Sequence, residues 1–196
     1  NAIIHVLRCF DNDNIVHVDG NVNPIRDKET IDIELQLKDL ETVEKRLEKV
    51  KKAAKTGNKE AQVEAALLER IRTTLLEGVS ARTVVPQNND EEELMEAFQL
   101  ITAKPVLYVC NVDEGSAVNG NAYVDQVKEL VKDENAEVII LSVGAEADIT
   151  ELESYEERQV FLEDMGLTEP GSAVLIRAAY KLLNLQTYFT AGVKEV

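Results

Sequence analysis

Two short polar segments follow two apolar runs of the sequence, and their residue types could recognise a nucleotide base. Asn111-Val-Asp-Glu114 comes directly after Val106–Cys110, and Ser142-Val-Gly-Ala145 comes after the run that ends at Leu141. An asparagine amide can brace neighbouring loops, and an acid three residues later can accept hydrogen bonds from purine N–H groups. Backbone N–H groups of the second segment can donate to an acceptor on the same base. The pattern indicates a base pocket, with polar loops that merely cap strands as the simpler alternative.

Three apolar runs rich in β-branched residues predict the strands of a parallel sheet. They are Ala2–Leu7, Val106–Cys110 and Val138–Ser142, and such runs are typical of strands buried on both faces. Between the second and third, Ala122–Glu134 has a helical apolar face, which predicts a strand–helix–strand unit. Ligands of open α/β sheets bind beyond the carboxyl ends of strands, so both polar segments and Arg8–Asn12 are expected at one edge. The apolar face of the helix contains Val124, Val127, Leu130 and Val131.

Three further helices are predicted outside this unit. Two of them lie near Tyr155–Met165 and Ser172–Leu183, with Gly166 at a position that suits a helix C-terminus. The third begins at an N-cap at Asn89, with an acid three residues later, and extends to about Thr102.

The region between the first two strands has a different pattern, which is helical and highly charged. Apolar residues recur with a 3.5-residue period from Asp27, Gly57-Asn58 interrupts them, and a second stripe continues to Gly78. The pattern predicts an antiparallel helical hairpin with coiled-coil packing, inserted at about residues 27–80. At about 1.5 Å per residue the first arm is roughly 45 Å long, so we expect it to project from a small sheet. The predicted seam contains Ile33, Gln36, Leu40, Val43, Leu47, Val50 and Ala54 on the first arm, and Val63, Leu67, Ile71 and Leu75 on the second.

The tip of this hairpin has a local excess of positive charge within an acidic chain. Seven basic residues and one acid, Glu48, lie from Lys45 to Lys59, whereas the whole chain has a formal charge of −16. One interpretation is a solvated helix face, and the other is a contact with RNA or an acidic partner. The basic residues are Lys45, Arg46, Lys49, Lys51, Lys52, Lys55 and Lys59.

The composition argues against several classes of protein. An excess of 37 acidic over 21 basic residues argues against a protein that wraps nucleic acid, and the absence of Trp argues against base-stacking platforms. Cys9 and Cys110 are predicted to be buried thiols, and His5 and His17 to be sheet residues. We predict no metal site and no catalytic triad. No apolar run reaches the roughly 18–20 residues that cross a bilayer, so we expect a cytoplasmic protein.

Longer stretches of the sequence resemble the YchF/Obg-like ATPase family. Asn111-Val-Asp-Glu114 is similar to the fourth GTPase motif, Asn-Lys-x-Asp, and Ser142–Ala145 resembles the fifth. The resemblance extends over essentially the whole chain, the hairpin included. Its other stretches are His5–Val18, Asp32–Leu35, Ala103–Pro105, Tyr108–Glu114 and Leu183–Val196, the last of which resembles the junction into the family's TGS domain.

The resemblance implies a partial P-loop GTPase-like, Rossmann-like α/β fold and a nucleotide switch linked to the ribosome and translation. It implies that ATP is bound and hydrolysed with Mg²⁺, and it leaves GTP open as a second substrate. Glu114 is one methylene longer than the usual Asp, and Val112 replaces the usual Lys, so we expect adenine to be favoured over guanine. The residues expected around the base are Asn111, Val112, Glu114, Ser142, Val143 and Gly144.

The chain departs from the family in lacking two of its motifs. It contains neither a Gly-x-x-x-x-Gly-Lys-Ser/Thr string nor an Asp-x-x-Gly segment. We therefore expect an internal fragment without the P-loop and most of the TGS domain, with no catalytic residue, no Mg²⁺ and no ATPase activity of its own. The expected parts are residues 1–26 and 81–182 of the G domain, the hairpin at 27–80 and the TGS start at 183–196. Sheet surface left open would favour self-association. The alternative is a non-catalytic interaction module whose hairpin binds RNA or a protein.

Overall fold

The computed structural model describes residues 2–12, 14–15, 20–134 and 136–189, which form two compact units. The sheet unit joins the chain up to Pro24 to the chain from Val106, and the hairpin unit is Ile25–Pro105. Residues 81–105, which the sequence analysis assigned to the sheet domain, therefore belong with the hairpin. The physical reason is burial, because Ala81, Phe98 and Leu100 pack into the same apolar core as the hairpin helices.

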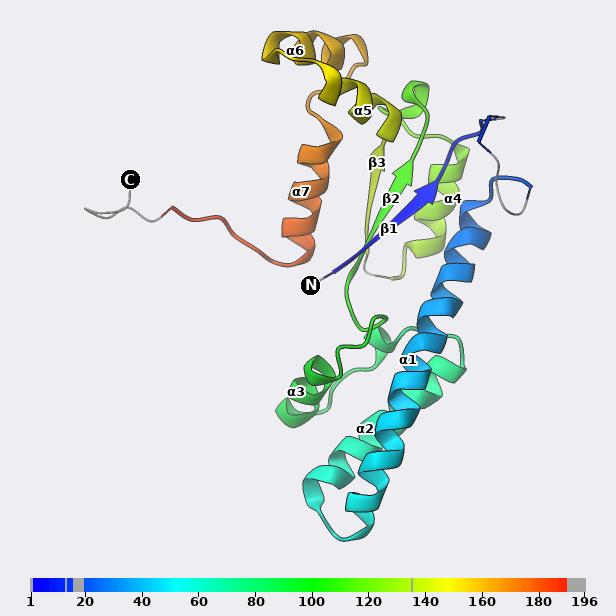
Figure 1. Ribbon diagram of the computed structural model, residues 1–196, viewed down its shortest axis with the longest axis vertical. Helices are drawn as coiled ribbons and strands as arrows, with labels where there is room; N and C mark the ends of the chain where they lie inside the picture. The colour runs from blue at the N-terminus through cyan, green and yellow to red at the C-terminus, as the bar shows by residue number, and fades with distance from the viewer. Residues whose placement is uncertain (1, 13, 16–19, 135, 190–196) are drawn as a thin grey trace. The chain divides into compact units, whose positions relative to one another are not determined.

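The sheet unit is built on three parallel strands in the order β1 (Ile3–Arg8), β2 (Val106–Asn111) and β3 (Glu137–Leu141). The register pairs Arg8 with Asn111 and Asn111 with Leu141, so the carboxyl ends of all three strands lie side by side (Figure 1). Helix α4 (Ala122–Val131) connects β2 to β3 and confirms the predicted strand–helix–strand unit.

Helices α4 and α7 (Gly171–Leu182) cover opposite faces of the sheet (Figure 1). On β2, Tyr108 packs in the core beneath α4, and Leu107 packs in the core beneath α7. Burial on both faces was predicted for every strand, but β2 alone is buried along its length. On β1, Ile4 and Val6 are 49% and 56% exposed, because β1 lies at the edge and α7 packs on β2 and β3.

Three further findings concern the helices of the sheet unit. Helix α6 (Tyr155–Asp164) and α7 lie where helices were predicted, and Gly166 after α6 has a φ of 70°. Helix α5 (Val143–Glu151) replaces the loop predicted after β3. Leu130 was predicted on the buried face of α4 but is 36% exposed, because the face that meets the sheet is formed by valines of that helix such as Val127.

Residues 183–189 contain no helix or strand. Residues 190–196 of the expected TGS start, and His17, lie outside the described residues. His5 is a residue of β1, with its ring centroid 5.6 Å from that of Tyr108. Within the described ranges, no helix is both long and apolar enough to cross a membrane.

The hairpin unit begins with the antiparallel pair α1 (Pro24–Lys55) and α2 (Lys59–Leu76), as predicted. The break between the helices is local. Gly57 has a φ of 89°, a conformation that favours glycine. Asn58 then caps α2, because its side-chain oxygen accepts a hydrogen bond from the Ala61 N–H at 3.1 Å.

The seam residues of α1 are buried or half-buried from Gln36 onward. The Gln36 amide donates to the carbonyl of Gly78 at 3.1 Å, just beyond the end of α2. Ile33 was predicted in the seam but is 55% exposed, because it lies one turn before Gln36 and thus beyond the end of its partner helix. The buried part of the seam includes Val43 and Leu47.

Helix α3 (Asn89–Phe98) completes the hairpin unit after the short turn η1 (Ala81–Thr83). Its cap is Asn88, whose side chain accepts from the Glu91 N–H at 3.0 Å, whereas the sequence analysis placed the cap at Asn89. The helix also ends before the predicted Thr102, because Gln99 has a left-handed φ of 52° and the residues after it contact α1.

The contact that holds this turn to α1 is a buried carboxylate. Asp39 is 2% exposed and accepts hydrogen bonds from the N–H groups of Ile101 and Thr102 at 2.9 and 2.6 Å. The hydroxyl of Thr102 donates to the same carboxylate at 2.7 Å. One side chain thus satisfies three donors that would otherwise be poorly paired.

Candidate nucleotide-base site and charged hairpin

Asn111, the last residue of β2, joins the ends of all three strands. Its side-chain Oδ1 accepts a hydrogen bond from the Val143 N–H at 3.0 Å. Its backbone carbonyl accepts from the Cys9 N–H at 2.7 Å, and the next residue, Val112, donates to the carbonyl of Leu141 at 2.9 Å. These bonds fix the relative positions of the two polar segments that the sequence analysis singled out.

The segment after β3 is the first turn of α5. Ser142 caps it, since its Oγ accepts from the Ala145 N–H at 3.4 Å and its carbonyl from the Glu146 N–H at 3.0 Å. The Val143 N–H is used by the asparagine described above. Gly144 is exposed, and of these first-turn amides its N–H alone has no partner within the described part of the chain. The predicted row of donors is therefore reduced to a single exposed N–H.

The turn η2 (Glu114–Ser116) after β2 gives neighbouring residues different roles. Val112 is 2% exposed, so its side chain belongs to the core and offers a ligand no polar contact. Asp113 caps η2 through a hydrogen bond from the Ser116 N–H at 3.0 Å. Glu114 is exposed, and its carboxylate has no hydrogen-bond or ion-pair partner among the residues described. Glu114 is therefore the carboxylate of this turn that is available to a ligand.

Helix α5 is anchored to α7 by Glu146. Pro170, at the N-cap of α7, has no side-chain group that could cap the helix. The Glu146 carboxylate takes this role, because it accepts from the N–H groups of Gly171 and Ser172 at 2.5 and 3.0 Å. A Cβ on Gly171 would overlap the Leu141 side chain and lie 3.0 Å from Glu146 Oε1, so a larger residue there would displace these side chains.

The loop after β1 is tied to α4. The Asn121 amide donates to the carbonyl of Cys9 at 2.7 Å, while its Oδ1 caps α4. The Tyr123 hydroxyl donates to the Asp11 carboxylate at 3.0 Å, and this hydrogen bond raises the pKa of Tyr123. Cys9 is a buried free thiol whose pKa is raised by a hydrogen bond with Cys110 and by burial. These contacts hold the loop after β1 at the same end of the sheet as Asn111.

The seven basic residues of the hairpin tip divide into two groups. Three of them are held by acids: Lys45 by Glu41, Arg46 by Glu64 at 2.5 Å and Lys51 by Glu69 at 2.6 Å. Hydrogen bonds from Lys45 and Lys38 lower the pKa of Glu41 to about 2. The side chains of the other four make no ion pair or hydrogen bond in the ranges that the structure describes, and these are Lys49, Lys52, Lys55 and Lys59.

The four unpaired basic residues form a smaller positively charged surface than the sequence predicted. Lys49, Lys52 and Lys55 are three residues apart on α1, so they form one stripe of the helix. Arg46 is also occupied by the hairpin itself, since its guanidinium lies 4.5 Å from the centre of the Phe98 ring.

Comparisons with known proteins agree with this architecture. No family model matches the chain. The chain is 47% identical over 195 residues to the ribosome-binding ATPase YchF of Haemophilus ducreyi, covering 100% of this chain and 53% of that protein. It is 46% identical over 197 residues to the ribosome-binding ATPase YchF of Bacillus subtilis. The structure of the Schizosaccharomyces pombe YchF GTPase matches it with a TM-score of 0.84 at 33% identity. The chain belongs to the YchF family.

The structural match covers 99% of this chain and 53% of the Schizosaccharomyces pombe chain. It confirms the α/β, partial P-loop GTPase-like fold that the YchF resemblance implied. The chain spans about half the length of the curated relatives it matches.

The structure brings the two predicted base segments of this YchF chain together through the hydrogen bond between Asn111 and Val143. The predicted tip residues lie in the other unit. Sequence reasoning missed Glu146 and Asn121, which hold α5 and the loop after β1 in place. For Asn121 a signal existed, because an asparagine directly before an apolar-periodic helix is typical of an N-cap. For Glu146 there was none, since its partners lie 25 and 26 residues away.

Proposed function

We propose that this chain supplies the base-binding part of a regulatory nucleotide hydrolase of the YchF type, which binds and hydrolyses ATP. The observation that carries the proposal is the hydrogen bond from the Val143 N–H to the Asn111 side chain, which ties together two segments that carry one exposed donor and one exposed acceptor. The donor is the Gly144 N–H and the acceptor is the Glu114 carboxylate. Adenine presents an exocyclic amine beside a ring nitrogen, which requires one acceptor and one donor.

The same residues favour adenine over guanine. Guanine presents two adjacent donors, N1–H and the N2 amine, which need a carboxylate held in a fixed position. Glu114 has a longer side chain than Asp, and no hydrogen bond fixes its carboxylate within the described residues. Val112 is buried and adds no polar contact. We therefore propose ATP as the preferred nucleotide and GTP as the weaker one.

Hydrolysis itself is assigned to a longer protein of the family. Phosphoryl transfer needs a phosphate cradle and Mg²⁺, and the 196 residues contain no Gly-x-x-x-x-Gly-Lys-Ser/Thr string. In the described ranges, no group of three or more His, Cys, Asp or Glu residues could hold a metal ion. The residues present do not fit a Mg²⁺ site, so we propose that this chain alone does not hydrolyse ATP.

The test of the base site is Gly144→Ala in a protein of the relatives' full length that carries this sequence. A Cβ at Gly144 would meet no atom nearer than Ser142 Oγ at 3.9 Å, so the fold should tolerate it. We expect ATP affinity, measured by calorimetry, to fall about tenfold because the added methyl group occupies the approach to the N–H.

Ala147→Ser is the matched control, because it adds one atom at an exposed position farther along α5. It should leave ATP affinity unchanged. Unchanged affinity in Gly144→Ala, with unchanged thermal stability, would contradict the placement of the base.

A second function, partner binding by the hairpin, is favoured by the stripe of Lys49, Lys52 and Lys55. The curated relatives are named ribosome-binding ATPases, and unpaired lysines attract phosphates over long range. We propose that this stripe contacts ribosomal RNA. In the alternative, the hairpin is the working surface of a non-catalytic module and nucleotide only positions it. Turnover of ATP by the full-length protein would exclude that alternative.

We also propose that the chain alone self-associates through β1. This strand has an unpaired edge in the described sheet, and Ile4 and Val6 expose apolar surface beside it. Exposed strand edges with apolar side chains favour pairing between chains.

A further inference from the structure

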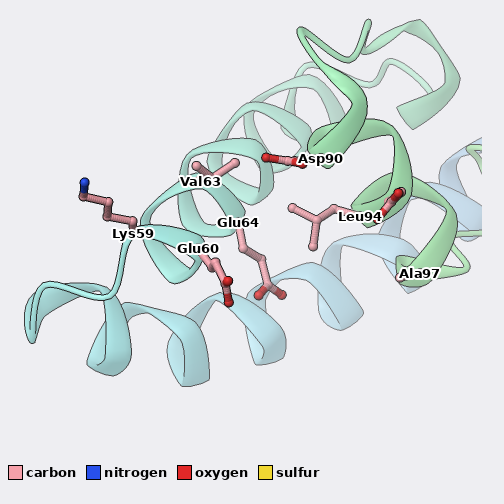
Figure 2. A pocket seen from close by; sticks show the side chains of 8 residues that line it. Lys59, Glu60, Val63, Glu64, Asp90, Leu94 and Ala97 are labelled. Atoms are coloured by element: carbon pink, nitrogen blue, oxygen red, sulfur yellow. The ribbon is translucent and has the colours of Figure 1, made fainter.

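A groove of about 550 Å³ lies in the hairpin unit between α2 and α3 (Figure 2). Its apolar floor is formed by Val63, Leu94 and Ala97, and its acidic rim includes Glu60, Asp90 and Glu93. Figure 2 shows Asp90 and Leu94 pointing from α3 toward α2. A volume of this size is in the usual range of ligand pockets, which is about 300–1,000 Å³.

The groove results from helical spacing on its two walls. On α2, Glu60 and Val63 are three residues apart, and on α3, Asp90, Leu94 and Ala97 are four and three residues apart. Each set therefore lies on one face of its helix. Leu94 is only partly buried at the border of the hairpin core, so it presents apolar surface to whatever enters the groove.

The carboxylates of the rim have no basic partner among the described residues. In the part of the chain that the structure describes, the carboxylates of Glu60, Asp90 and Glu93 have no ion pair or hydrogen bond. Glu64 also lines the groove, but Arg46 holds it at 2.5 Å. The one basic lining residue, Lys59, points away from α3 (Figure 2). Unpaired carboxylates around an apolar floor favour a ligand that is both cationic and apolar.

We propose that this groove binds a cationic amphipathic segment of a partner protein. One branched apolar side chain of the segment packs on Val63 and Leu94, and its Lys or Arg side chains pair with Glu60, Asp90 and Glu93. The lysine stripe of a second copy of this chain is a poorer occupant. The apolar residues between its lysines are Val50, which already packs against the hairpin core, and the small Ala53 and Ala54, so it offers no large free side chain for the floor. This surface is separate from the base site and does not depend on the proposed nucleotide function.

The probe is a helical peptide of Leu and Lys at amphipathic spacing with a single Trp. The chain contains no Trp, so fluorescence reports the peptide alone. We expect saturable binding that weakens with salt, and a loss of affinity of about tenfold in Ala97→Arg, which brings a positive charge into the groove. Ala66→Arg is the matched control, because Ala66 is exposed on α2 and does not line the groove. It should bind the peptide as the unmodified chain does.

Three results would overturn the proposal. Equal loss in Ala97→Arg and Ala66→Arg would mean that the peptide is attracted by the net charge of the chain, and equal binding of a Leu and Glu peptide would mean unspecific apolar contact. Self-association that Ala97→Arg abolishes would assign the groove to a second copy. Circular dichroism checks the fold of each variant, and if Ala97→Arg unfolds, Glu60→Gln with Glu93→Gln must produce the loss of affinity.

Discussion

The sheet unit and the hairpin unit place their candidate functional groups in opposite ways. In the sheet unit, hydrogen bonds to Asn111 and Ser142 leave one exposed N–H and one exposed carboxylate without a partner among the described residues, so the site depends on single atoms. In the hairpin unit, the candidate surfaces are a stripe of lysines and an acidic groove, whose effects depend on summed charge. A single substitution at the carboxyl ends of the strands should therefore remove one specific contact with a ligand. Substitutions of the hairpin charges should weaken binding step by step, and their effect should depend strongly on salt.

The two units also differ in how their cores are closed. The hairpin unit is closed by a buried carboxylate, Asp39, on which three donors converge. The sheet unit has an open side, because Ile4 and Val6 on β1 remain half exposed. The stability of the hairpin unit should therefore depend on one polar side chain. The association state of the sheet unit should depend on the residues exposed along β1.

The largest expected effect is that of Asp39→Ala. Removal of the carboxylate leaves three donors without their acceptor, and we expect the free energy of unfolding to fall by about 3 kcal/mol. Urea unfolding followed by helical circular dichroism measures the change. Glu48→Ala, at an exposed position of the same helix without a partner in the described residues, should change stability by less than about 0.5 kcal/mol. Equal effects of the two variants would show that the buried carboxylate does not close the hairpin.

The next effect is that of charge reversal on the hairpin. Lys49→Glu, Lys52→Glu and Lys55→Glu together should weaken ribosome co-sedimentation of the full-length protein by about tenfold or more at low salt. The paired residues provide the control, because Lys45→Gln with Lys51→Gln removes charges that acids already neutralise. If the triple reversal leaves co-sedimentation unchanged, this result would contradict the proposal that the lysine stripe contacts the ribosome.

The smallest effect concerns the open edge of the sheet. Val6→Lys should lower the self-association of this chain in analytical ultracentrifugation by a few-fold, because a lysine on an edge strand opposes pairing between chains. Val85→Lys is the comparison, since Val85 is also an exposed valine but belongs to the hairpin unit and to no strand. A monomer at all concentrations would contradict the role proposed for β1.

Local patterns in the sequence predicted most helices and all three strands, but not their surroundings. The apolar runs could not show that β1 lies at an edge, because edge position depends on strand order. Helix α5 was missed because Ser142 is followed three residues later by Ala145, so the Glu or Gln of a capping box is absent. The contact between Asp39 and Thr102 joins residues 63 positions apart, and no local pattern announces it.

The ion pairs of the hairpin also show which contacts a local sequence pattern can predict and which it cannot. The pair of Lys45 with Glu41 can be read from the sequence, because the residues are four apart on one helix. The pairs of Arg46 with Glu64 and of Lys51 with Glu69 cannot, because they depend on the register between two helices. Counting charges alone therefore overestimated the free positive surface of the tip.

The central claim, that the ends of β2 and β3 select adenine, is tested most directly by the ratio of ATP to GTP affinity. Calorimetry on the full-length protein, with and without Glu114→Asp, measures this ratio. The account predicts that the unmodified protein prefers ATP and that Glu114→Asp shifts the ratio toward GTP by about tenfold, because the shorter carboxylate can meet the two guanine donors. Equal affinities for both nucleotides in the unmodified protein, or a ratio that Glu114→Asp does not move, would contradict it.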